Sequence, residues 1–240
     1  MLRNVDSSAK IFSPVKGLYL LLDGLTLFFP LVLSFDQRVH FFSKWRSVFF
    51  ASLIVAIPFL IWDIIFTENG FWGFNADYLV GLNIYNLPIE EVLFFFVVPF
   101  ACAFIYECCK YYFRSTSFKF LNRILFFVIP LYALILSLLE PTGWYTLSVV
   151  ISSGIVLFMW LRKPHFQFIG IAFLISLVPF LLVNGVLTGG ATSQPVVWYS
   201  EAQKVAPRIW TIPMEDVLYS FTLIVGVLLG TEYFEERKLR

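Results

Sequence analysis

The chain has 240 residues, of which 59% are hydrophobic, 20% are aromatic and only 14% are charged. This composition exceeds what a soluble domain can bury, so it predicts an integral membrane protein. The formal net charge of +1 gives no reason to expect nucleic acid or an acidic polymer as a partner.

Seven apolar stretches are long enough to cross a bilayer as helices, which takes roughly 20 residues each. The first begins near Gly17 after a polar start, and no small-residue cleavage site follows it, so we expect it to remain as a helix. We therefore predict an all-α integral membrane protein with seven transmembrane helices. Their expected ranges are 17–34, 47–66, 88–109, 121–139, 144–162, 166–187 and 212–231.

Seven helices alternate in direction, so the cationic residues can be sorted by membrane side. Twelve fall on one side: Arg38, Lys44, Arg46, Lys110, Arg114, Lys119, Arg123, Arg162, Lys163, Arg237, Lys238 and Arg240. Five fall on the other: Arg3, Lys10, Lys16, Lys204 and Arg208. The positive-inside rule then predicts a multi-pass protein of the cell inner membrane, with the N-terminus outside and the C-terminus in the cytoplasm.

A nine-residue pattern occurs twice, at residues 86–94 and 211–219, and each copy opens a long apolar run. Both copies have a proline followed two residues later by a pair of acids, Glu90 with Glu91 and Glu215 with Asp216. Proline followed by acids is also an ordinary helix start. Carboxyl groups at a membrane helix are costly to desolvate, however, so the duplication favours a chemical role.

The repeat extends one helix upstream. Pro58-Phe-Leu and Pro179-Phe-Leu are followed by Asp63 and Asn184 respectively, whereas helix 1 matches helix 5 only through Asp23-Gly24 against Ser153-Gly154. Helices 2 and 3 recur as helices 6 and 7, an even number of helices later, which predicts parallel halves related by an axis along the membrane normal. We expect a 3+1+3 arrangement: a first repeat at 1–110, a linker with helix 4 at 111–143 and a second repeat at 144–240.

Parallel halves bring the four motif acids to one membrane depth. Carboxyl groups crowded in an apolar pocket titrate at different pH values, which suits one as proton donor and another as acceptor. We expect Glu90 and Glu215, the acids nearer the prolines, to be indispensable. Glu91 and Asp216 are the further candidates, and Tyr219 is placed one turn beyond Glu215.

Each motif follows a connection of about twenty residues, Thr67 to Leu87 and Thr188 to Ile212, longer than the usual few-residue link between helices. These are candidate lids. Their aromatic residues, among them Trp72, Trp198 and Trp210, are explained either as an interfacial belt or as the lining of an apolar substrate site.

The Pro-x-Glu-(Glu/Asp) motif at Pro88–Glu91 and Pro213–Asp216, together with the stretch from Asp63 to Trp72, resembles the membrane carotenoid cyclases that convert lycopene to β-carotene. In that family the halves occur as separate subunits or fused, and this chain resembles the fused form over nearly its whole length. Asn184 departs from the first copy, where Asp63 stands, so we expect the halves to be functionally unequal.

The resemblance implies an isomerase in carotenoid biosynthesis that cyclises the ψ end groups of lycopene through γ-carotene to β-carotene. It implies a lipophilic carotenoid substrate within the bilayer, and makes other enzymes of the carotenoid pathway candidate partners. The motif acids would be catalytic, and the substrate would be contacted by Asp63, Trp62, Trp72, Asn184, Phe94, Tyr219 and Trp210. We expect no cofactor, since the Gly-rich dinucleotide fingerprint does not occur, and no metal, since Cys102, Cys108 and Cys109 lack metal-ligand spacing.

Two other classes of function remain open at this point. One is another membrane prenyl-chain enzyme: a carotenoid hydratase, a cyclase of C50 carotenoids or a terpene cyclase. The other is a small proton-coupled transporter with parallel three-helix repeats. The sequence leaves open which ring isomer is formed, whether one or both ends react, and the oligomeric state.

Overall fold

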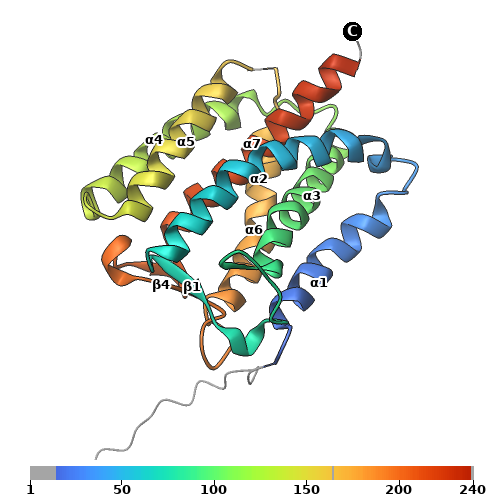
Figure 1. Cartoon of the computed structure of the whole chain (residues 1–240). Helices are drawn as coiled ribbons and strands as arrows, with labels where there is room; N and C mark the ends of the chain where they lie inside the picture. The colour runs from blue at the N-terminus through green and yellow to red at the C-terminus, as the bar shows by residue number, and fades with distance from the viewer. Residues whose placement is uncertain (1–14, 164, 239–240) are drawn as a thin grey trace, which may run out of the picture.

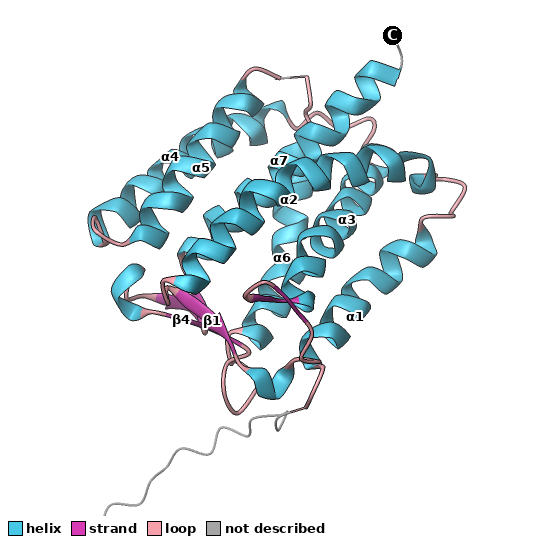
Figure 2. Cartoon of the chain, viewed as in Figure 1, coloured by secondary structure: helices cyan, strands magenta, loops and turns pink. Residues whose placement is uncertain are grey.

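The computed structural model describes residues 15–163 and 165–238. Within this part, seven α-helices form a bundle and short strands lie at one of its ends, opposite the C-terminus (Figures 1 and 2). The helices are α1 (Leu18–Leu33), α2 (Trp45–Glu68), α3 (Ile89–Tyr112), α4 (Lys119–Leu139), α5 (Trp144–Leu161), α6 (Ile169–Leu187) and α7 (Glu215–Lys238).

The seven helices expected from the sequence are present among the described residues, whereas a membrane crossing by all seven stays a prediction. Six helices are long and apolar enough to cross a membrane, while the 16 residues of α1 extend about 24 Å, less than the hydrocarbon core of about 30 Å. The largest departure is α7, expected at 212–231. It starts later because Ile212–Pro213 forms a strand, and it continues beyond its apolar part to Lys238.

Helices α3 and α7 occupy the centre of the bundle. Helix α1 packs on α3 as α5 packs on α7, and both α2 and α6 contact the two central helices. Helix α4 lies outside, against α5 and α6. Small residues allow the closest approach: a Cβ placed on Gly230 of α7 would lie 3.0 Å from the Cβ of Ala51 of α2.

At the end that carries the C-terminus, ion pairs tie the central helices together. The Lys110 ammonium donates to Glu107 at 3.0 Å and to Glu232 at 2.8 Å, so one cation joins α3 to α7. Lys44 likewise reaches Glu235 from the start of α2. The sidedness predicted from charge depends in part on Arg3, Lys10 and Arg240, which lie outside the described residues, and it stays a prediction.

The two long connections fold over the opposite end of the bundle. Strand β1 (Trp72–Phe74) pairs antiparallel with β4 (Val197–Tyr199), with Gly73 opposite Trp198. Two short hairpins lead into the central helices, β2 (Asn83–Ile84) with β3 (Leu87–Pro88), and β5 (Arg208–Ile209) with β6 (Ile212–Pro213). We call these connections the first cover, 69–88, and the second cover, 188–214.

The covers repeat one another in detail. Gly73 and Trp198 are separated by the same number of residues as Glu90 and Glu215, and so are the hairpin turn residues Tyr85 and Trp210. Tyr85 has a φ of 59° and Trp210 a φ of 57°, a left-handed conformation that is uncommon for residues other than glycine. Each hairpin therefore makes the same tight turn before its acid pair.

Candidate active site

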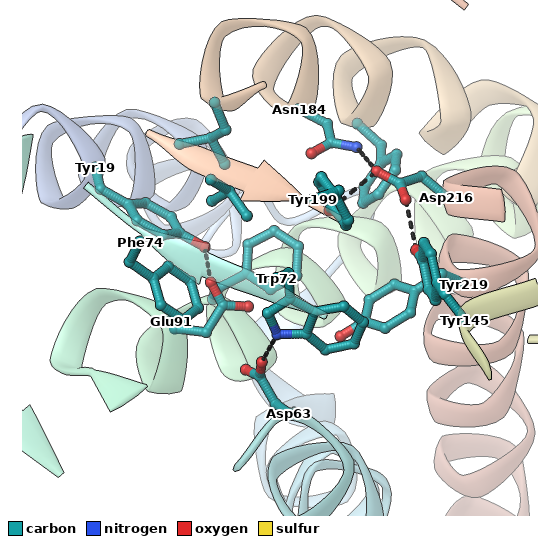
Figure 3. A pocket seen from close by; sticks show the side chains of 14 residues that line it. Tyr19, Asp63, Trp72, Phe74, Glu91, Tyr145, Asn184, Tyr199, Asp216 and Tyr219 are labelled. Atoms are coloured by element: carbon teal, nitrogen blue, oxygen red, sulfur yellow. Dashed lines mark hydrogen bonds between the residues drawn. The ribbon is translucent and has the colours of Figure 1, made fainter. Parts of the chain in front are cut away.

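A small buried cavity of about 40 Å³ lies where the covers meet the first turns of α3 and α7 (Figure 3). Every helix except α4 contributes to it, and the strands β1 and β4 form its roof. Its lining consists of Tyr19, Asp63, Trp72, Phe74, Glu91, Phe94, Tyr145, Phe180, Asn184, Leu187, Val197, Tyr199, Asp216 and Tyr219.

Glu91 is the motif acid that the first half presents to this cavity. It stands in the first turn of α3 and is only 8% exposed. The hydroxyl of Tyr19, from the first turn of α1, donates to Glu91 Oε2 at 2.6 Å. A tyrosine from a neighbouring helix thus holds the carboxyl group toward the cavity, as Figure 3 shows.

Asp216 is its counterpart in the second half, and it has more partners. The Tyr145 hydroxyl donates to Oδ1 at 2.5 Å, while Oδ2 accepts from the Asn184 amide at 2.6 Å and from the Tyr199 hydroxyl at 3.3 Å. Burial raises the pKa of Tyr199 well above its ordinary value, and the negative charge of Asp216 raises it further, so this cover residue remains a hydrogen-bond donor.

A third acid, Asp63 of α2, reaches the cavity between the two. Its Oδ1 accepts from the indole N–H of Trp72 at 2.5 Å. Asn184 occupies the matching position on α6 but bonds to Asp216, whereas Asp63 bonds to the roof. The two positions share a place in the fold and differ in their partners.

The first acid of each motif bonds to a cover. Glu90 Oε1 accepts from the backbone N–H of Val80 at 2.7 Å, and Glu215 Oε1 accepts from the N–H of Val205 at 2.6 Å and from the Thr146 hydroxyl at 2.7 Å. Both carboxyl groups are fully buried, and neither lines the cavity. The motif thus provides one acid that anchors a cover and one that faces the cavity.

Most of the residues expected to contact substrate do line the cavity: Asp63, Trp72, Asn184, Phe94 and Tyr219. Trp62 lies behind this layer, with its ring centroid 5.3 Å from that of Tyr219. Trp210 does not reach the cavity. It is 60% exposed, and its indole packs over Gly185 and Gly190, because it occupies the turn of the second hairpin.

Seven lining residues were not among the expected site residues: Tyr19, Phe74, Tyr145, Phe180, Leu187, Val197 and Tyr199. Tyr19 and Tyr145 stand at matching places in α1 and α5 and bond to matching acids. Matching Tyr19 with Tyr145 shifts the alignment of α1 with α5 by about one helical turn from the one based on Asp23-Gly24 and Ser153-Gly154. Pairing the tyrosines would have been the available signal. Among the described residues, no group of three or more His, Cys, Asp or Glu is arranged to hold a metal ion.

Comparison with known proteins identifies the family. The sequence model described as lycopene cyclase matches residues 16–109 and 142–234, so each matched segment contains one acid motif. The chain belongs to the lycopene cyclase family. Members of this family are enzymes that act on carotenoids, and the membrane helices found here agree with such a lipophilic substrate.

A curated relative is the bifunctional lycopene cyclase/phytoene synthase of Aspergillus oryzae (strain ATCC 42149 / RIB 40). It is 25% identical over 149 residues, which make up 62% of this chain and 22% of the fungal protein. The chain therefore spans about a fifth of the length of that relative. No solved structure matches the chain.

Proposed function

We propose that the chain is a lycopene β-cyclase that works by carboxylate acid–base catalysis. The observation that carries the proposal is the convergence of Glu91 and Asp216, from two matching motifs, on one buried cavity. In the reaction, a carboxylic acid adds a proton to C2 of the ψ end group, and a cation forms at C1. The C5=C6 double bond attacks C1, and loss of the C6 proton leaves the β ring, so no atoms are gained or lost overall.

The hydrogen bonds suggest how the acids divide these steps. Hydrogen bonds to a carboxylate stabilise its charged form, and Asp216 accepts three of them. We therefore assign Asp216 as the proton acceptor. Glu91 accepts one bond, from Tyr19, and is assigned as the proton donor. The carboxylate of Asp63, which accepts a hydrogen bond from Trp72, would stabilise the cation that forms between Glu91 and Asp216.

The walls of the cavity suit a carbocation. Trp72, Tyr145 and Tyr219 surround it, and aromatic faces attract positive charge. The paired strands β1 and β4 roof the cavity over the acids, which would shield a cation there from bulk water. Exclusion of water favours a cyclase over a hydratase, which must deliver water to the same cation.

We further propose that the molecule is a 3+1+3 internal repeat of parallel halves, with domains at 1–110, 111–143 and 144–240. The family match to two segments, the matching helix contacts and the symmetric β1–β4 register all support this arrangement. In this arrangement the axis passes near Gly73 and Trp198, and the active site is shared between the halves.

The cellular setting is also part of the proposal: a multi-pass protein of the cell inner membrane with its C-terminus in the cytoplasm. The substrate would be lycopene dissolved in the bilayer. The fungal relative combines lycopene cyclase and phytoene synthase in its name, which supports the proposal that this chain works beside other enzymes of the carotenoid pathway.

The decisive experiment is expression of the chain in a bacterial host that accumulates lycopene, followed by chromatography of the pigments. Formation of γ-carotene and then β-carotene is the expected result. A hydroxylated product would instead establish the hydratase. Unchanged lycopene in cells that hold folded protein would refute both.

A further inference from the structure

A second hollow adjoins the acid cavity on the side away from the covers, between α1, α3 and α6. This groove has a volume of about 370 Å³, within the range of roughly 300–1,000 Å³ that is usual for ligand sites. Its surface is almost entirely apolar. On α3 it follows one helical face through Phe94, Val98, Ala101 and Ile105, and the rise from the first to the last is about 16 Å.

The groove and the acid cavity are separated by two aromatic side chains. Phe94 of α3 and Phe180 of α6 line both spaces, and their ring centroids are 6.5 Å apart. The cavity alone, at about 40 Å³, is too small for a cyclic end group, so binding requires these rings to move. Leu25 and Phe29 on the other rim are exposed, so the groove also opens to the lipid-facing surface.

The matching groove of the second half does not communicate with the acids. It lies between α2, α5 and α7, and none of its lining residues also lines the cavity. On that side the rings of Tyr219 and Phe59 are in edge contact at 5.0 Å, and Trp62 packs against both. The residue of α6 that matches Trp62 is Val183, a lining residue of the first groove.

We propose that the α1–α3–α6 groove binds the polyene chain of the substrate and that Phe94 and Phe180 form the gate through which one end group reaches the acids. This rests on the proposed function for the nature of the ligand. The groove offers an apolar chain a lined path that is continuous with the cavity and open to the bilayer. The halves thus differ in chemistry and also in whether their groove leads to the acid cavity. One groove, that of α1, α3 and α6, holds the substrate.

The test compares two substrates in membranes that contain the enzyme: lycopene, and a shortened apo-lycopenal that keeps one ψ end group but has a truncated chain. The variant is Ala101→Trp, which fills the groove about two turns below Phe94. The matched control is Leu182→Trp on α6, a site that is 64% exposed and outside the groove. Ala101→Leu provides a milder variant, and gel filtration verifies folding of each.

We expect Ala101→Trp to lower conversion of lycopene at least 10-fold, Ala101→Leu to lower it less, and both to leave conversion of the short substrate within about twofold of the wild type. Leu182→Trp should convert both substrates normally. Normal conversion of lycopene by folded Ala101→Trp would overturn the proposal. An equal loss of conversion for both substrates would also overturn it, because the substitution would then have disturbed the acid site and not the binding of the chain.

A binding measurement separates this inference from the proposed function. Lycopene should co-purify with the wild type in detergent. The amount of bound lycopene should fall at least 10-fold with Ala101→Trp but not with Leu182→Trp. If the wild type converts neither substrate yet retains lycopene in this pattern, the cyclase proposal fails and the groove assignment stands. If retention is the same in all variants, the groove assignment fails.

Discussion

The two halves of the molecule place matching acids at one cavity but surround them differently. Glu91 accepts a hydrogen bond from Tyr19, whereas Asp216 accepts from Tyr145, Asn184 and Tyr199. The scaffold that positions each acid is duplicated: a central helix, a tyrosine on the neighbouring helix and a cover held by the preceding glutamate. A duplicated scaffold with unequal hydrogen bonding supports the proposal that the halves divide the donor and acceptor roles of one reaction.

The sharpest test of this division removes each cavity acid in turn. Glu91→Gln and Asp216→Asn keep the shape of the side chain and remove its titrating group. We expect each to lower formation of γ-carotene and β-carotene together by roughly 10²-fold or more, the usual scale of acid–base catalysis. Pigments from lycopene-fed membranes would be followed by chromatography. A variant that cyclises the first end at the normal rate but stops at γ-carotene would show two independent sites.

A second test reverses the asymmetry at α6. Asn184→Asp removes the amide that donates to Asp216 at 2.6 Å and places a carboxyl group against it. Loss of a hydrogen bond to a charged group costs about 1.5–3 kcal/mol, so the rate should fall by about 10-fold or more. Asn184→Ser, which removes the amide without adding an acid, is the control and should show only the part of the loss that comes from the missing hydrogen bond. Equal rates for Asn184→Asp and the wild type would contradict the role given to Asp216.

A third test concerns the acids that hold the covers. In Glu90→Gln and Glu215→Gln the side-chain amide oxygen can still accept from Val80 or Val205, so we expect losses of less than about fivefold. Glu90→Ala and Glu215→Ala leave a buried N–H without its partner. They should lose more activity and make the covers easier to cleave in limited proteolysis. Losses near 10²-fold in the Gln variants, with intact covers, would return Glu90 and Glu215 to the catalytic role that the motif alone suggested.

The last test leaves the protein unchanged and follows the order of its products. With one composite site and one groove that reaches it, the second end group must rebind after the first has reacted. Monocyclic γ-carotene should therefore appear first and accumulate when enzyme is limiting. Samples taken through a single time course suffice. Direct appearance of β-carotene at the earliest times, without free γ-carotene, would argue for processing of both ends in one binding event.

Sequence reasoning succeeded where the signal was long and local. Apolar stretches located all seven helices, and the duplicated motifs located the end of the bundle that holds the acids. The covers were recognised by length, but the pairing of β1 with β4 joins three-residue strands that are far apart in the chain, and such short strands have no periodicity to read.

The choice between neighbouring acids was also beyond the sequence. Glu90 and Glu91 point in directions about 100° apart on the helix, so which of them faces the cavity depends on how α1 and the first cover pack against α3. Tyr19 and Val80 decide this by bonding to one acid each. Trp210 shows the converse: its aromatic character suggested a substrate contact, whereas its place in a tight turn directs it to Gly185 and Gly190.

The pairing of β1 with β4, centred on Gly73 and Trp198, joins the two covers through one two-stranded sheet. A Cβ on Gly73 would lie 2.4 Å from the indole of Trp198, so the strands meet at a point that admits no side chain. Neither half can therefore lift its cover alone without breaking the pairing with the other. In the proposed mechanism, both halves together would keep water from a cation beside either acid, and the lipid-facing side would be the route by which a carotenoid arrives and departs.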